Sequence, residues 1–255
     1  MIRKYLSQKT PGRFAYMLGS KGEEIKYVKH NSLRYNEALD YIDKLVSKKE
    51  KFSILDIGTS PFTFLLRKRY PKATVYSADY SDKFARDCRN NHIFFKRVDL
   101  QQRNLPRIAS KFDIVTFLEV VEHLKMNHRR VVKWISINLK NNGVCIIQTP
   151  NKYSFKSFVL MIISDKLWGK VTESKEKDPE FYHHKEFSMK EIIKLISSTN
   201  SKIVEAKYSL YFDDPSSALA YHQGVNFLKP FFLFSYQLVK VFPQLRRGMQ
   251  IVFKK

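Results

Sequence analysis

An alternation of strand-like and helix-like segments is the feature that most constrains how this chain folds. Short apolar segments of β-like composition alternate with turns and helix-like segments, and the strand-like ones cover residues 52–57, 73–79, 92–98, 112–118 and 143–149. Parallel strands need crossover connections, which are usually helices and almost always right-handed. The pattern therefore predicts an α/β fold, with a Rossmann-like, doubly wound, mostly parallel sheet and helices on both faces.

The rest of the chain extends this pattern at both ends. Residues 1–50 are predicted to be an N-terminal helical segment, because apolar residues recur at roughly helical spacing over 32–48. Residues 51–255 are predicted to form the main domain, with an irregular insertion at about 151–187 and an aromatic-rich one at about 211–242.

Local signals define the elements around these insertions. An apolar helix is predicted at about 155–168 inside the first insertion. Ser188 and Glu191 have the spacing of a capping box and predict the start of an amphipathic helix. Two further strands are predicted over 202–210 and 248–255.

The composition is strongly basic, with 46 Lys and Arg residues against 24 Asp and Glu and a formal net charge of +22. Such a field favours anionic partners, including nucleic acid, phosphorylated glycans and an acidic membrane surface. A lysine-biased composition with solvated side chains gives the same net charge without any anionic partner. Three alternatives therefore stay open: RNA, an anionic membrane surface, or no such partner. Nothing in the sequence indicates an obligate protein partner.

The cellular location is predicted from what the sequence lacks. Cys88 and Cys145 form no disulfide pattern, which fits a reducing compartment. The N-terminus has no apolar signal-peptide region, and no apolar stretch reaches the length of a membrane span. We expect a cytoplasmic protein, in one version peripheral at the inner membrane surface. The segment 227–242 is then a surface-lying or lid-forming segment rather than a span. Simple packing against the sheet is its alternative.

Polar residues end the first two predicted strands. Asp56 ends the first strand and Gly58 follows it, where a Rossmann-like fold brings the backbone close to a nucleotide. Asp79 ends the second strand, where a carboxylate can accept hydrogen bonds from both hydroxyls of a ribose. The loop lacks the third glycine that the pyrophosphate of a dinucleotide needs, which argues against NAD. An ordinary turn at a strand end has the same short pattern.

An ordered set of segments from about Phe52 to Leu210 resembles the class I S-adenosylmethionine-dependent methyltransferases. The segments are LDIG, VYSADYS, VDLQQRNLP, FDIVTFLEVVEHL, GVCIIQTPN and HHKEFSMKEI. The resemblance implies a seven-stranded sheet whose last strand is antiparallel, and S-adenosylmethionine as methyl donor. It also implies donor-binding residues: Asp56 and Gly58 at the methionine end, Asp79 at the ribose, Tyr80, Asp99 and Leu100 at the adenine, and Glu119 near the methionine moiety.

The loop after Gly58 departs from the pattern of that family, which usually carries further glycines. Here Thr59, Ser60 and Pro61 follow. S-adenosylmethionine has no phosphate, so the loop tolerates side chains. We expect the Ser60 hydroxyl to replace a backbone contact to the donor, and Pro61 to occupy the first position of a helix.

A second group of residues has the types and spacing of metal ligands. Glu119, Glu122 and His123 have the spacing i, i+3, i+4, which places them on one side of a helical turn. His183 begins a later His-x-x-Glu-Phe-Ser pattern. Two carboxylates and two histidines suit Mg²⁺ or Mn²⁺. In the alternative interpretation, Glu122 and His123 cap the helix and fill the cleft floor without a metal.

Two narrower resemblances support the metal. EVVEHL is similar to the metal-binding segment of ubiquinone-pathway O-methyltransferases. Its combination with TPN and HHKEFS is similar to small-RNA 3′-terminal 2′-O-methyltransferases, in which two glutamates and two histidines bind magnesium. The resemblance implies Glu119, Glu122, His123 and His183 as ligands, since His183 matches the fourth position better than His184 does.

Three functions follow from these observations. The first is O-methylation of a small-molecule, glycan or lipid-linked hydroxyl, with His123 or His183 as general base if no metal is bound. The second is RNA 2′-O-methylation, which the charge and the four-ligand set favour, although no appended RNA-binding module is recognisable. The third is a non-catalytic S-adenosylmethionine-binding protein, favoured only by the glycine-poor loop after β-like residues 52–57, which we call the donor loop (residues 58–61). For an enzyme, a carbon or amine acceptor stays open.

Overall fold

The computed structural model of the chain describes residues 21–47, 51–155, 183–211, 213 and 229–255. Its helices are α3 (Lys21–Val46), α4 (Pro61–Arg69), α5 (Ala85–Asn90), α6 (His128–Asn138), α8 (Met189–Ser197) and α10 (Lys229–Val241). Its strands are β1 (Ser53–Ile57), β2 (Thr74–Asp79), β3 (Phe94–Arg97), β4 (Phe112–Leu118), β5 (Leu139–Pro150), β6 (Lys202–Ser209) and β7 (Gly248–Lys254). Short 3₁₀ turns cover Asp82–Phe84, Val121–His123 and Pro243–Leu245.

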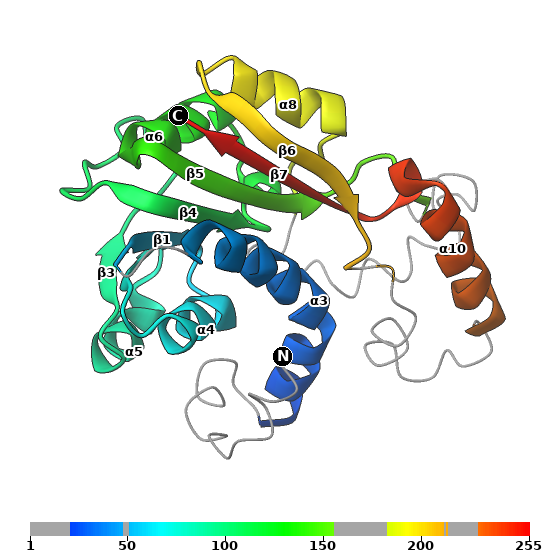
Figure 1. Ribbon diagram of the computed structural model, residues 1–255, viewed down its shortest axis with the longest axis horizontal. Coiled ribbons are helices and arrows are strands. Elements are labelled where there is room, and N and C mark those ends of the chain that lie inside the picture. Colours follow the sequence, from blue (N-terminus) through cyan, green and yellow to red (C-terminus); the bar gives the residue numbers. More distant parts are fainter. Residues whose placement is uncertain (1–20, 48–50, 156–182, 212, 214–228) are drawn as a thin grey trace.

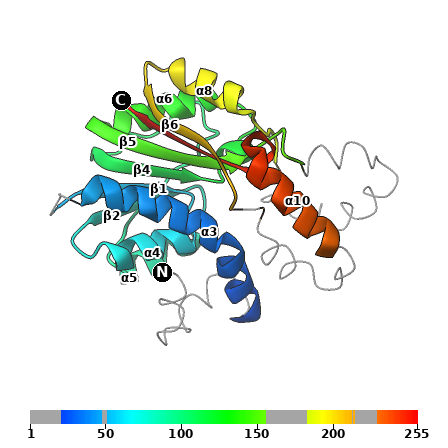
Figure 2. The ribbon, with the colours of Figure 1, turned by 45° about the vertical axis from the view of Figure 1, so that its right-hand side comes forward.

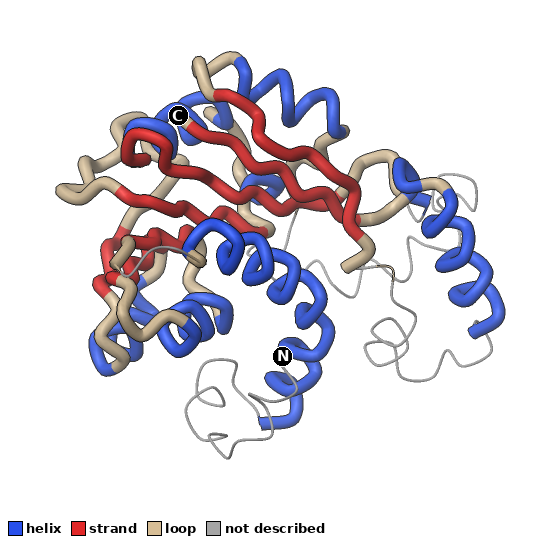
Figure 3. Tube along the Cα trace, in the orientation of Figure 1, coloured by secondary structure: helices blue, strands red, loops and turns tan. Residues whose placement is uncertain are grey.

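All seven strands form one sheet in the order β3-β2-β1-β4-β5-β7-β6 (Figure 3). The pairs from β3 to β5 are parallel, and β7 runs antiparallel between β5 and β6. The predicted doubly wound sheet with an antiparallel last strand is confirmed. The strand order reverses between β1 and β4, which is the place where ligands bind in sheets of this kind.

Helices cover both faces of the sheet, as predicted (Figures 1 and 2). The apolar side chains of α6 and α8 share one core cluster, and those of α3 and α4 share the other. Neighbouring residues of β4 illustrate the division, since Ile114 belongs to the α3–α4 cluster and Val115 to the α6–α8 cluster. This alternation follows from the two-residue period of a strand. The central strands β1 and β4 are buried on both faces and are therefore mostly apolar, whereas the edge strands β3 and β6 carry exposed charged residues.

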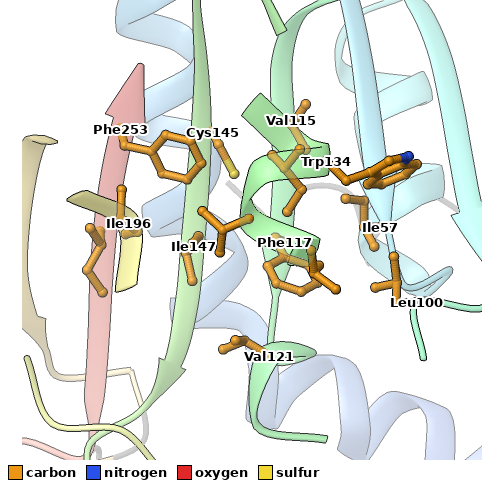
Figure 4. Packing of buried hydrophobic residues seen from close by; sticks show 14 of the residues in the cluster. Ile57, Leu100, Val115, Phe117, Val121, Trp134, Cys145, Ile147, Ile196 and Phe253 are labelled. Atoms are coloured by element: carbon orange, nitrogen blue, oxygen red, sulfur yellow. The ribbon is translucent and has the colours of Figure 1, made fainter. Parts of the chain in front are cut away.

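The cluster under α6 and α8 supports the middle of the sheet. Figure 4 shows Trp134 from α6 and Ile196 from α8 packed over residues of β4, β5 and β7. Cys145 is fully buried here, and both Cys88 and Cys145 are free thiols. The core therefore holds rigidly the strand ends from which the site is built.

The boundaries differ from the expectations in a few places. Helix α3 begins at Lys21, well before residue 32, and β5 begins at Leu139 rather than at Gly143. The predicted helix at about 155–168 lies almost entirely outside the described residues, as does much of the aromatic-rich insertion. None of the described helices has the length and apolar character needed to cross a membrane.

Candidate functional site

Gly58 begins the loop that leaves β1 at the carboxyl edge of the sheet. Its φ is +88°, and its N–H donates to the Ala78 carbonyl at 2.9 Å. A Cβ at this position would lie 2.8 Å from Cγ2 of Val120. Glycine alone adopts this conformation without strain. The loop therefore packs closely against the turn after β4, across the point where the strand order reverses.

Asp79 holds the same loop from the neighbouring strand. Its carboxylate accepts the N–H groups of Thr59 at 2.7 Å and of Ser81 at 2.9 Å. The Thr59 hydroxyl lies 2.8 Å from the hydroxyl of Ser77. These bonds place the carboxylate beside the loop after Gly58, and its predicted contact with the ribose hydroxyls stays a prediction.

The Asp56 carboxylate points into the protein. It is 2% exposed, and its two oxygens accept hydrogen bonds from the hydroxyls of Thr63 at 2.5 Å and Thr116 at 2.6 Å. Burial raises its pKa to about 6, although both hydroxyls oppose the shift. Asp56 therefore shapes the donor loop from beneath, and its predicted contact with the donor stays a prediction.

Side chains replace the missing glycines of the donor loop. Ser60 is the N-cap of α4, where its hydroxyl accepts the N–H of Phe62 at 3.2 Å. Thr63 completes a capping box by accepting the N–H of Ser60 at 3.0 Å. Pro61 opens the helix, as predicted. Because the Ser60 hydroxyl is engaged in the cap, its predicted contact with the donor would compete with that hydrogen bond.

Of the three residues predicted to contact the adenine, two line a surface hollow and one lies in the core. Tyr80 is 51% exposed and lines, together with Asp99, a hollow of about 360 Å³. Asp99 accepts the N–H of Gln101 at 2.9 Å. The Leu100 side chain belongs to the core cluster under α6. The structure thus brings Tyr80 and Asp99 to one hollow. Because the side chain of Leu100 is in the core, an adenine contact at that position would be made by its backbone.

Glu119 lies at the end of β4 in a left-handed conformation, with φ +55°. Non-glycine residues held this way are strained and are frequent at functional sites. One carboxylate oxygen is 3.2 Å from the Tyr211 hydroxyl, and the other is 3.8 Å from the guanidinium of Arg34. Glu119 precedes the 3₁₀ turn rather than belonging to it, so the predicted helical spacing with Glu122 and His123 does not apply.

Glu122 belongs to this turn, and its side chain is fully buried. One of its carboxylate oxygens accepts the Thr149 hydroxyl at 3.0 Å. The other, Oε1, receives no hydrogen bond from an N–H or a hydroxyl of the described residues, and the carboxylate of Glu119 lies beside this side chain. Burial, followed by the charge of Glu119, raises the pKa of Glu122 well above its usual range. A buried carboxylate oxygen without a donor is costly unless a proton or a cation compensates it.

Backbone hydrogen bonds bring His183 to the same place. The N–H groups of His184 and Lys185 donate to the carbonyl of Glu122 at 2.8 Å and 3.1 Å. The ring centroids of His183 and His123 then lie 5.0 Å apart, and the two rings meet edge to face. The Nδ1 atom of His183 is 3.3 Å from Oε1 of Glu186. Such a carboxylate partner fixes the orientation of an imidazole ring.

Three of the four predicted ligands converge. One donor atom from each of Glu122, His123 and His183 lies within 4.8 Å of the other two, and Glu119 is outside this group. A separation of about 4.8 Å is the largest that one ion bonded at about 2.4 Å can bridge. The donor types and the bare oxygen of Glu122 fit a divalent cation. Glu119 is engaged by Arg34 and Tyr211 instead.

Sequence reasoning missed the residues that support the site. Thr63 had a local signal, since Ser60 and Thr63 have capping-box spacing. Thr116 and Tyr211 had none, because their partners are 60 and 92 residues away. Arg34 was also missed, although its side chain is buried and faces Glu119.

A comparison with family models matches residues 28–206 to a methyltransferase domain. No curated protein matches the chain. The matched range covers every strand from β1 to β5 and reaches into β6.

Solved structures share the fold at low sequence identity. Coclaurine N-methyltransferase bound to N-methylheliamine and SAH is 14% identical, with a TM-score of 0.55 over 86% of this chain and 72% of that one. A putative sarcosine dimethylglycine methyltransferase from Galdieria sulphuraria is 12% identical, with a TM-score of 0.57 over 89% and 88%. The cyclase SpnF is 14% identical, with a TM-score of 0.54 over 86% and 80%. These structures therefore support the fold and leave the acceptor open.

Proposed function

We propose a hydroxyl acceptor for this chain, which belongs to the methyltransferase-domain family and is an S-adenosylmethionine-dependent methyltransferase. The acceptor hydroxyl belongs to a small molecule, a glycan or a lipid-linked compound. The observation that carries the proposal is the convergence of Glu122, His123 and His183 beside the donor loop. A hydroxyl must lose its proton to be methylated, and this cluster offers groups that accept one.

The donor is proposed to lie across the carboxyl edge between β1 and β4. Asp79 would accept the ribose hydroxyls, and Tyr80 and Asp99 would meet the adenine in the hollow that they share. The close packing of Gly58 against Val120 leaves backbone, rather than a side chain, beside the methionine end. Arg34 faces Glu119 at this end and supplies positive charge for a carboxylate.

Methyl transfer is an in-line displacement. The acceptor oxygen forms a bond to the methyl carbon, and the bond from that carbon to sulfur breaks with its electron pair left on sulfur. Without a metal, the hydroxyl proton goes to His123 or His183. A divalent ion held by Glu122, His123 and His183 would instead lower the pKa of the acceptor hydroxyl, so that its proton passes to solvent. The mixed oxygen and nitrogen donors suit Mg²⁺ or Mn²⁺. The chain's own contribution is mainly to align donor and acceptor.

Several structurally similar proteins are N-methyltransferases, including the coclaurine enzyme. An amine acceptor needs no metal to lower its pKa, whereas a hydroxyl benefits from one. The preference for a hydroxyl therefore rests on the fit of Glu122, His123 and His183 to a divalent ion.

The second candidate is 2′-O-methylation of RNA. The net charge of +22 favours it, and a 2′-hydroxyl would suit the same cluster. Binding through phosphate contacts falls steeply with salt. A steep salt dependence of methyl transfer to RNA would favour this candidate over a small-molecule acceptor.

The test is methyl transfer from labelled S-adenosylmethionine to RNA, lipid and glycan pools, with and without EDTA. We expect one pool to be labelled on oxygen, labelling to stop in EDTA, and Mn²⁺ to restore it. Glu122→Gln should lose transfer while keeping donor binding. His184→Ala is the matched control, because the hydrogen bond from His184 to the carbonyl of Glu122 is made by its backbone N–H, which alanine keeps.

Two results would contradict the proposal. Full turnover in excess EDTA would show that no metal is needed and that His123 or His183 acts as an ordinary general base. Donor binding without transfer to any pool would favour the non-catalytic alternative.

A further inference from the structure

Helix α10 presents a large apolar face outward. Its exposed residues recur with the spacing i, i+3, i+4, i+7, which places them on one side of a helix. We call this side the outer face of α10, and it consists of Pro230, Leu233, Phe234, Gln237, Lys240 and Val241. Leu233, Phe234 and Val241 are 44%, 64% and 70% exposed. A helix on a water-facing surface would place polar residues there.

The orientation of α10 is set by specific contacts on its other side. Val239 is 1% exposed. The guanidinium of Arg246 donates to the carbonyls of Val239 and Tyr208, both at 3.0 Å. These bonds join the end of the helix to β6, so the outward direction of Phe234 and Val241 is built into the fold.

The charge of this region selects the partner. No Asp or Glu occurs in residues 229–247, which cover α10 and the turn after it, and Lys240 is an exposed basic residue on the outer face. Two copies of such a surface would repel each other, which disfavours self-association. An anionic surface would be attracted instead, with about 1 kcal/mol for each basic residue that reaches it.

Hydrogen bonds connect the turn after α10 to the strand end beside the candidate site. Helix α10 lies beyond the carboxyl ends of the parallel strands in both views (Figures 1 and 2). The side-chain amide of Asn151 donates to the carbonyls of Gln244 and Arg246 at 2.9 Å and 2.8 Å. Asn151 lies two residues after Thr149, whose hydroxyl donates a hydrogen bond to the carboxylate of Glu122. A surface bound by α10 would thus be held near the cluster.

We infer that the outer face of α10 docks the protein on an anionic lipid membrane. Its apolar side chains enter the boundary between headgroups and acyl chains, and Lys240 on the same face meets the lipid phosphates. Docking turns the carboxyl edge of the sheet toward the membrane, so the acceptor is an amphiphile held there. This choice of acceptor rests on the proposed function, whereas docking does not.

The test is flotation of the full chain with vesicles of phosphatidylcholine alone and of phosphatidylcholine with phosphatidylglycerol. We expect binding to the anionic vesicles at low salt and much weaker binding to the neutral ones. The double variant Leu233→Ser with Phe234→Ser should bind at least about tenfold more weakly, since it loses two inserted side chains. Ile137→Ser removes a 50% exposed apolar side chain from α6 and should bind like the wild type.

Thermal unfolding checks that each variant folds. Three results would overturn the docking proposal: wild type that does not float with anionic vesicles, a double variant that floats equally well, or wild type that binds neutral and anionic vesicles alike. A wild-type dimer that the double variant abolishes would assign the face to self-association and overturn it too.

A separate readout distinguishes this proposal from the proposed function. Calorimetric binding of S-adenosylmethionine should be equal in the wild type and the double variant. Lost flotation with intact donor binding supports docking through α10. A protein that floats but methylates no hydroxyl contradicts the proposed function and leaves docking standing.

Discussion

Replacing Asp56 by Asn should change how the stability of this protein depends on pH. The carboxylate is buried beneath the donor loop, and its hydrogen-bond partners among the described residues are the neutral hydroxyls of Thr63 and Thr116. Burial raises its pKa from 3.8 to about 6 in the folded protein. The folded state therefore binds this proton more tightly than the unfolded state does.

The sign of the effect follows from linkage. Between about pH 4 and pH 6 the folded state carries more protons at Asp56, so the free energy of unfolding falls as pH rises through this window. A shift of about two pKa units corresponds to about 3 kcal/mol. The stabilisation is fully present below the unfolded pKa and is lost once pH exceeds the folded one.

Urea unfolding of the wild type and Asp56→Asn across this pH range measures the effect. Asn keeps the shape of the side chain and cannot ionise. The stability of the variant relative to the wild type should rise by about 3 kcal/mol from pH 4 to above pH 7. Asp213, whose pKa burial also raises to about 6, is present in both proteins and cancels. Parallel curves would show that the two hydroxyls fully compensate the buried charge and would refute this reasoning.

Three further perturbations test other parts of the structure. Asp79→Asn should weaken S-adenosylmethionine binding about ten- to a hundredfold in calorimetric titration, because it removes charged acceptors for the ribose hydroxyls; Asp82→Asn, on an exposed side chain nearby, should not. Equal affinity would remove Asp79 from the donor site. Gly248→Ala should lower the free energy of unfolding in urea by about 1–3 kcal/mol, because the new Cβ would lie 2.4 Å from the buried ring of Tyr211; an unchanged midpoint would mean that the ring moves freely. Ser188→Ala should cost about 1 kcal/mol by removing the capping box of α8, and an unshifted melting curve in calorimetry would show that the cap is dispensable.

The sequence alone was enough for the order and type of most elements. Strands buried on both faces are mostly apolar, so β1, β4 and β5 stand out as short apolar runs between polar turns. The start of α8 followed from a capping box that acts within four residues. The strand-end positions of Asp56 and Asp79 followed from the same local pattern.

The internal organisation of the site was decided by tertiary structure. Asp56 meets Thr116 only because β1 and β4 are neighbours at the point where the strand order reverses. Glu119 lies outside the group formed by Glu122, His123 and His183, and its carboxylate contacts Arg34 and Tyr211, which are far from it in sequence. His183 joins the cluster because the backbone after it bonds to Glu122. Propensity and capping act within a few residues of a chain. Contacts between residues far apart in sequence depend on how whole elements pack, and a single sequence does not specify that packing locally.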